Sequence, residues 1–243
     1  MTKSIVVMVL TAVFASATAA PVFAQAGGGP QSVDRPLFLD INAGIAGRPD
    51  GLTTGTTFAL FGENGSAVTR IEPDTSALLD ARLGYRIRPH VGVAVGVSGG
   101  QSDVAATTTA SVPSPIRFAS PTIVSLDGGS AKRREIGFHL QAVYAQQLTD
   151  TLLLSIAGGP SIVHLQQGVP SVTVSASTPA VASANETGNG FGGNIGADLS
   201  SLFSTHYGVG VFVRYVRANI DLPSASGVKA GGVQAGAGLR VRF

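Results

Sequence analysis

The chain has 243 residues, and 44% of them are hydrophobic while only 12% are charged. A charged share of about half that of ordinary soluble domains indicates that much of the surface faces something other than water. A net charge of +2 without a basic run gives no support for nucleic-acid binding, and the absence of cysteine excludes disulfides and thiolate metal sites.

Residues 1–24 have the features of a secretory signal peptide. Lys3 precedes a short apolar segment and then small residues, with cleavage expected after Ala24 or Ala26. The apolar segment is short for an uncleaved membrane anchor, which is the less favoured alternative. Residues 25–34 are interpreted as a short periplasmic lead. Beyond them no apolar stretch is long enough for a transmembrane helix.

The rest of the chain, 35–243, is predicted to be one domain built from strands. Apolar residues alternate with polar or very small ones in repeated segments, which is the pattern of a β-strand with two different faces. In chain order these segments are 36–46, 76–87, 91–100, 135–145, 151–165, 191–201, 207–218 and 231–243.

Alternating strands suit either a soluble sandwich or a membrane barrel, and three features favour the barrel. The strands exceed the five or six residues typical of globular sheets and match the roughly 9–11 that a tilted strand needs to cross a bilayer. Short connections alternate with long ones. Four aromatic residues also share the apolar face near the short-turn end, as in an interfacial girdle: Tyr85, Tyr144, Tyr207 and Phe243.

The predicted fold is therefore an all-β, transmembrane, up-and-down antiparallel barrel of eight strands. It has short periplasmic turns and long extracellular loops at about 48–75, 103–132, 167–187 and 219–229. The first strand should pair with the last, because unpaired backbone groups are costly in hydrocarbon. In the first loop Asn64-Gly65 predicts a hairpin above the membrane. If its arms crossed the bilayer instead, the barrel would have ten strands.

These segments and the terminal Phe243 resemble the small eight-stranded bacterial outer-membrane barrels of the OmpA and OmpX type. The resemblance covers roughly 34–243, without a periplasmic C-terminal domain. It implies that Phe243 is a signal for the outer-membrane assembly machinery. It also implies localisation in the cell outer membrane after export through the inner membrane, as a monomer in contact with outer-membrane lipids.

The inward face of such a barrel would carry a polar network. The predicted members are Asp40, Asp80, Arg82, Arg86, His139, Asp198, Arg214 and Arg240; with Glu135 and Arg242, four acids face five bases. We expect Asp40 to lie between Arg240 on the last strand and Arg82 or Arg86 on the second. For Arg86 and Arg242, contact with water at the periplasmic mouth is an equal alternative.

Gly158-Gly159-Pro160 interrupts the fifth segment. Proline cannot donate a hydrogen bond to a strand ladder, so a bulge is expected there. A bulge would turn His164 inward, whereas without one His164 faces lipid. His164 with Ser161 is also the only loose candidate for a catalytic pair, and it is not favoured.

Lys132, Arg133 and Arg134 begin the fourth strand and Arg217 ends the seventh, at the loop-side rim and at the height of lipopolysaccharide phosphates. Arg134 and Arg217 are candidate lipopolysaccharide-binding residues, with solvated rim charge as the alternative. No catalytic, cofactor-binding or metal-binding residues and no cofactor are expected. The predicted function is a non-enzymatic structural or surface-interaction role through the loops. Alternatives are a narrow porin-like barrel that passes small solutes and, less favoured, a lipid-modifying enzyme.

Overall fold

The computed structural model describes residues 35–47, 51–72, 74–117, 120–175 and 178–243. The predicted signal peptide and periplasmic lead lie outside these residues and stay predictions. Within the described ranges no helix is long and apolar enough to cross a membrane. The strands are β1 (Leu37–Ala46), β2 (Leu52–Leu60), β3 (Glu63–Glu72), β4 (Ser76–Arg88), β5 (Val91–Val112), β6 (Thr122–Gln147), β7 (Leu152–Ser175), β8 (Thr178–Leu202), β9 (Tyr207–Leu222) and β10 (Ala225–Arg242).

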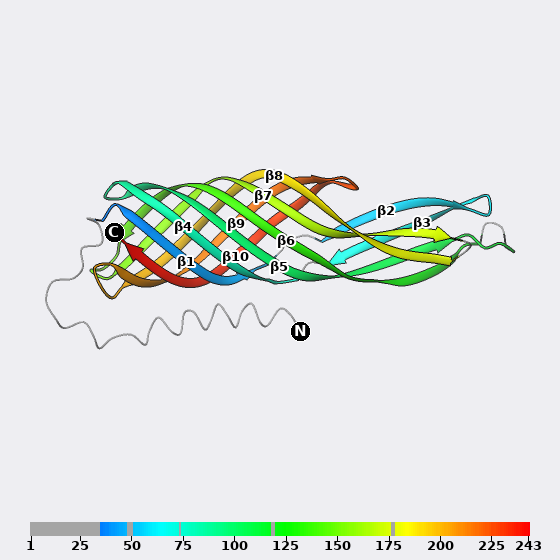
Figure 1. The fold of residues 1–243 in the computed structure, drawn as a ribbon, viewed down its shortest axis with the longest axis horizontal. Coiled ribbons are helices and arrows are strands. Elements are labelled where there is room, and N and C mark those ends of the chain that lie inside the picture. The colour runs from blue at the N-terminus through cyan, green and yellow to red at the C-terminus, as the bar shows by residue number, and fades with distance from the viewer. Residues whose placement is uncertain (1–34, 48–50, 73, 118–119, 176–177) are drawn as a thin grey trace.

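Eight of the ten strands form a closed antiparallel ring in the order β1, β4, β5, β6, β7, β8, β9, β10 (Figure 1). The ring closes where β1 pairs with β10, in a register that runs from Phe38 opposite Arg242 to Ala46 opposite Gln234. The predicted antiparallel barrel fold and the pairing of its first and last strands are therefore confirmed.

The two remaining strands, β2 and β3, form a hairpin outside the ring. β5 pairs with β4 along 91–101 and with β3 along 105–111, so β3 continues the line of β4. β2 pairs with β3 and continues β1 in the same way. A hairpin is present in the first loop as predicted, but its turn lies at Phe61-Gly62, where both residues have positive φ, and Asn64 and Gly65 lie within β3 opposite Ala59 and Phe58. The hairpin extends the barrel along its axis, and a ring of ten strands is not formed (Figure 1).

The long connections predicted at 103–132 and 167–187 are not irregular loops. β5 and β6 stay paired out to Val112 opposite Thr122, and β7 and β8 out to Ser175 opposite Thr178. These segments are rich in Val, Thr, Ala and Ser, and the β-branched residues among them favour strands. The barrel therefore carries long hairpin arms at one end and short turns at the other, as Figure 1 shows.

The prediction of a bulge at Pro160 is wrong. The register of β7 against β6 is the same on both sides of this proline, and against β8 it runs without a shift. The ladder with β6 instead omits the pairs at Gly159 and Pro160, which accommodates the missing N–H. His164 accordingly lies on the outward face, where it forms a hydrogen bond with Asn189.

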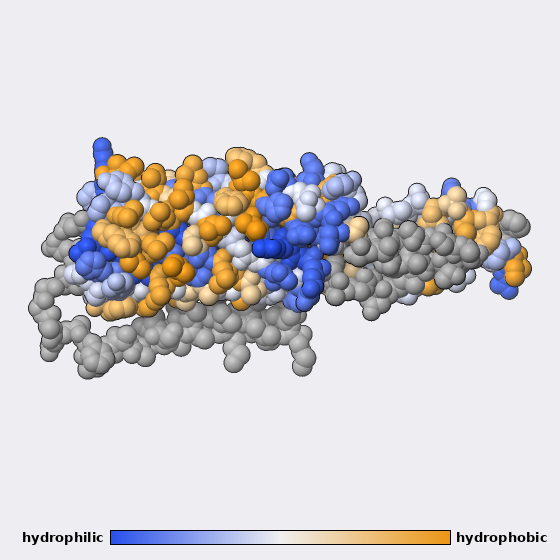
Figure 2. Space-filling view, in the orientation of Figure 1, coloured by the Kyte–Doolittle hydropathy of each residue, from blue (hydrophilic) through white to orange (hydrophobic). Residues whose placement is uncertain are grey.

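The outer surface has an apolar belt around the end with the short turns. Figure 2 shows this belt on the face in view, with a hydrophilic band beside it. Exposed apolar side chains come from the alternating positions of the strands, and they include Leu83, Val93, Leu140, Val209 and Leu239. The predicted alternation therefore places its apolar face outward in this part of the barrel, as in a barrel that faces lipid.

Along β9 the sense of the alternation reverses without a shift in register. Val209 and Val213 point outward and are exposed, whereas Val216 and Ile220 point inward and are buried. The change falls between Tyr215 and Arg217. Above this point the inward residues form an apolar core like that of a soluble barrel: Val163, Leu165, Val216, Ala218, Ile220, Leu222, Val228 and Ala230. The apolar belt thus ends at the level of Tyr215.

Candidate functional site: the barrel lumen and its outer rim

The structure places all the predicted lumen residues on the inward face of the ring. Their side chains are buried. The most exposed is that of Arg82, the partner of Asp40, with 11% of its side-chain surface accessible. The set comprises Asp40, Asp80, Arg82, Arg86, His139, Asp198, Arg214 and Arg240. Parity along each strand is sufficient to bring them together, because every second residue faces the lumen.

Asp40 lies at the centre of a cluster at the barrel seam. It is opposite Arg82 on β4 and opposite Arg240 on β10. Its carboxylate oxygens lie 2.6 Å from Arg82 Nη2 and 2.7 Å from Arg242 Nη1, while Arg240 Nε is 3.8 Å away. Arg240 turns instead toward Asp198 on β8 and also donates to Asn42 Oδ1 at 2.7 Å. The cluster therefore connects four strands across the lumen.

Phe38 forms the floor of this cluster at the short-turn end. The guanidinium groups of Arg82 and Arg242 lie 5.6 and 5.2 Å from the centre of its ring, within cation–π range. Gly84 lies opposite Phe38, and a Cβ there would come within 2.1 Å of the ring. Arg86 is also buried, so neither it nor Arg242 is a water-exposed residue of the mouth.

A second group crosses the middle of the lumen. Arg214 Nη2 donates to Asp80 Oδ2 at 2.7 Å and to Gln234 Oε1 at 2.7 Å. Asn42 Nδ2 donates to the other carboxylate oxygen of Asp80 at 2.9 Å. Asn42 thus joins this group to the seam cluster through Arg240.

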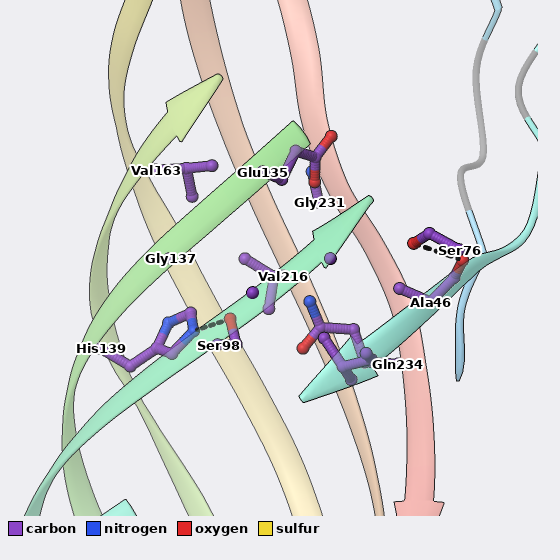
Figure 3. A pocket seen from close by; sticks show the side chains of 13 residues that line it. Ala46, Ser76, Ser98, Glu135, Gly137, His139, Val163, Val216, Gly231 and Gln234 are labelled. Carbon is purple, nitrogen blue, oxygen red and sulfur yellow. Dashed lines mark hydrogen bonds between the residues drawn. The ribbon is translucent and has the colours of Figure 1, made fainter. Parts of the chain in front are cut away.

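His139 is held between two hydroxyl groups. Its Nε2 lies 2.9 Å from Ser98 Oγ (Figure 3). Its Nδ1 lies 2.9 Å from Ser161 Oγ. Asn194 Nδ2 donates to the same Ser161 oxygen at 2.8 Å. Ser161 therefore pairs with His139 inside the barrel, and His164 lies on the opposite face of β7.

Arg133 was missed as a lumen residue because it was grouped with Lys132 and Arg134 at the rim. It is buried and donates to Glu135 Oε1 and to Gln167 Oε1, both at 2.6 Å. The signal was available, since Arg133 shares the parity of His139 on the same strand. With it, the inward side chains comprise six arginines and four carboxylates: Arg82, Arg86, Arg133, Arg214, Arg240 and Arg242, and Asp40, Asp80, Glu135 and Asp198.

Little free space is left between these side chains. One cavity lies beside Ser98, His139 and Gln234, and Figure 3 shows the residues around it. A second lies beside Gln141 and Arg214. Each has room for about one water molecule. In the described part of the chain no group of three or more His, Cys, Asp or Glu residues is placed to hold a metal ion.

The predicted rim and assembly residues lie on the outer surface. Arg134 and Arg217 both point outward and are exposed. Phe243 is exposed next to the seam, where its N–H donates to Leu37 O at 2.9 Å. Roles of these residues in lipid binding and assembly stay predictions.

No family model and no curated protein matches the chain. Among solved structures, Neisserial surface protein A is 13% identical over 85% of this chain and 97% of its own, with a TM-score of 0.46. The outer membrane protein OprG from Pseudomonas aeruginosa is 13% identical over 86% of this chain and 96% of its own, with a TM-score of 0.46. The outer membrane protease OmpT from Escherichia coli is 10% identical over 90% of this chain and 99% of its own, with a TM-score of 0.42.

Proposed function

We propose that this protein is a monomeric, non-enzymatic outer-membrane barrel that does not conduct solutes and that presents hairpin arms outside the cell. The observation that carries the proposal is the filled lumen inside an apolar outer belt. Ion pairs join side chains of non-adjacent strands, Arg214 on β9 with Asp80 on β4 and Arg240 on β10 with Asp198 on β8. The two cavities beside them have room for about one water molecule each.

The charge pairing in the lumen supports a closed barrel. A path for solute would have to separate Asp80 from Arg214, or Asp198 from Arg240, and each pair is almost fully buried. Breaking a buried ion pair costs about 3–5 kcal/mol because each charge loses its partner. Such openings would be rare, so steady conduction is not expected.

The arms support a surface-interaction role. Among the described residues β2 pairs with β3 alone, which leaves its other edge available. This edge strand is nine residues long and has no charged residue, proline or register shift, the usual devices that protect an edge. An exposed edge of this kind can pair with an extended segment of a partner.

Conductance in a planar lipid bilayer tests the proposal. We expect refolded protein to show no steady single-channel steps after insertion, with insertion verified by protection of the barrel from added protease. The double variant Asp198→Ala with Arg240→Ala removes one buried pair and serves as the opened reference, in which conductance should increase. Steady steps in the unmodified protein would overturn the proposal and favour passage of small solutes.

Outer-membrane lipids, lipopolysaccharide and the assembly machinery are the proposed partners. The rim residues Arg134 and Arg217 are the two candidates for contact with lipid phosphates, and Phe243 is the proposed assembly signal. The two rim arginines have different surroundings, and this difference leads to a sharper proposal.

A further inference from the structure

Arg217 lies at the boundary between the apolar belt and the polar surface. It is the first outward residue of β9 after Tyr215, the point at which the alternation reverses. Its Nη1 donates to Tyr215 Oη at 3.3 Å, so the guanidinium is held beside the uppermost residue of the belt. A cation in this position meets the headgroup layer of a bilayer that surrounds the belt.

The outer surface beside Arg217 is open on its β8 side. Its neighbour there is Gly193, which places no side chain beside the guanidinium. Its neighbour on β10 is Gly231, which is buried, lines the inner cavity and donates its N–H to Glu135 Oε2 in the lumen. At Gly193 an added Cβ would have only one atom within 4 Å, Gly159 O at 3.7 Å, so the space there is open.

The surroundings of the hollow suit an amphipathic molecule. Toward the belt it is bordered by the exposed side chains of Ile195 on β8 and Val233 on β10. Toward the arms, the exposed Lys229 lies two residues before Gly231 on β10. Positive charge therefore lies above an apolar border, with open space over Gly193 on the β8 side of Arg217.

Arg134 is exposed as well, but it does not lie in a hollow. Its neighbours across the two ladders are Gln101 on β5 and Gln166 on β7, and both carry long side chains. A bulky headgroup would have to displace these side chains to approach Arg134 closely. The two rim arginines therefore differ in access although their charge is the same.

We propose that Arg217 and Gly193 form a specific site for the phosphate group of an outer-leaflet lipid, whose acyl chains lie against Ile195 and Val233. Arg217 supplies charge-assisted hydrogen bonds to the phosphate, and Gly193 supplies room for the headgroup. The proposal rests on the proposed insertion of the barrel into the outer membrane. It assigns Arg134 to the solvated rim.

Native mass spectrometry of the refolded protein in detergent, titrated with lipid A, tests this site. Arg217→Ala removes the charge, and Gly193→Leu fills the hollow while leaving Arg217 in place. We expect each to weaken lipid A binding about tenfold, the effect of losing a hydrogen bond to a charged group. Arg134→Ala and Gly99→Leu are the matched controls and should bind as the unmodified protein does.

Gly99 is a suitable control because it is also an outward glycine with open space, its nearest atom to an added Cβ being Glu135 O at 4.0 Å. Its neighbours across the ladders are Leu79 and Ile136, so no cation lies directly beside it. Retention of the heat-modifiable compact form on gel electrophoresis shows that each variant is folded.

The source of the phosphate is separated by two further titrations. Dephosphorylated lipid A should bind at least about tenfold more weakly, and inorganic phosphate should not compete with lipid A. Equal losses in Arg134→Ala and Arg217→Ala, or no loss in Gly193→Leu, would overturn the site. Failure of the barrel to insert into bilayers would instead refute the proposed function, and the conductance and protease measurements detect that outcome separately.

Discussion

Asp40 on the first strand and Arg242 on the last lie 2.7 Å apart, across the seam that closes the barrel. Asp40 also pairs with Arg82 at 2.6 Å, so one buried carboxylate serves arginines from both neighbouring strands. Asp40→Asn should leave these arginines buried without their counter-charge and lower the free energy of unfolding by about 3–5 kcal/mol. Urea titration of the protein in detergent micelles measures this change.

Asp150→Asn is the matched control for that substitution. Asp150 lies exposed in the turn between β6 and β7, where removal of a charge should change the free energy of unfolding by less than about 0.5 kcal/mol. If Asp40→Asn were as mild as Asp150→Asn, the seam cluster would not stabilise the closure of the barrel.

The packing of Phe38 against Gly84 gives a second prediction. A Cβ on residue 84 would lie 2.1 Å from Phe38 Cζ, and the ring cannot move freely because Arg82 and Arg242 lie over it. Gly84→Ala should therefore destabilise the barrel by about 1–3 kcal/mol, the usual cost of overpacking.

A double-mutant cycle checks the cause. In a Phe38→Ala background the ring is absent, so Gly84→Ala should cost much less than it does alone. Thermal unfolding of the four proteins in the same detergent gives the coupling energy. Additive effects of the two substitutions would show that Gly84 is needed for some other reason.

Alternation by itself was enough to predict most of the barrel and of its lumen. Strand parity is a property of the backbone, so Asp40, Asp80 and Arg240 had to share a face once their segments were strands. Closure between first and last strands followed from the cost of unpaired backbone groups in hydrocarbon. The same parity also placed Arg133 inward, but its position among three consecutive basic residues led to a rim assignment.

Other features depend on tertiary structure that a local pattern does not reveal. The segments taken as loops pair with each other over long ladders, and such pairing depends on the partner strand rather than on propensity alone. The alternation in β9 changes phase at the adjacent apolar residues Tyr215 and Val216, but the sequence alone does not tell a bulge there from an exchange of the apolar face. At Pro160 the ladder loses two pairs instead of forming a bulge, and both solutions fit the sequence.

The terminal aromatic is predicted to act in assembly rather than in stability. Phe243 is exposed, and only its backbone N–H is seen to bond to the first strand. Phe243→Ala should reduce the amount of folded protein in the outer membrane of expressing cells, while refolding of the purified chain into detergent is unchanged. Phe203→Ala, which alters another exposed aromatic at a short turn, should reduce neither quantity. Equal reduction in both variants would indicate a general need for interfacial aromatics.

The reversal along β9 predicts where the bilayer ends. The chain contains no tryptophan, so a single introduced tryptophan reports its own surroundings. Val211 lies on the outward face within the belt, and Asn219 lies on the same face beyond Arg217. Eight residues of strand separate them, which is about 26 Å along the strand.

In vesicles with brominated acyl chains, the tryptophan of Val211→Trp should be strongly quenched, because it faces hydrocarbon. The tryptophan of Asn219→Trp should be quenched little, and its emission should lie at longer wavelength, because it faces water. Both positions are on the outer surface, so neither substitution disturbs the lumen or the inner apolar core. Strong quenching at both positions would mean that the bilayer covers Arg217, and the polar boundary derived from β9 would then be wrong.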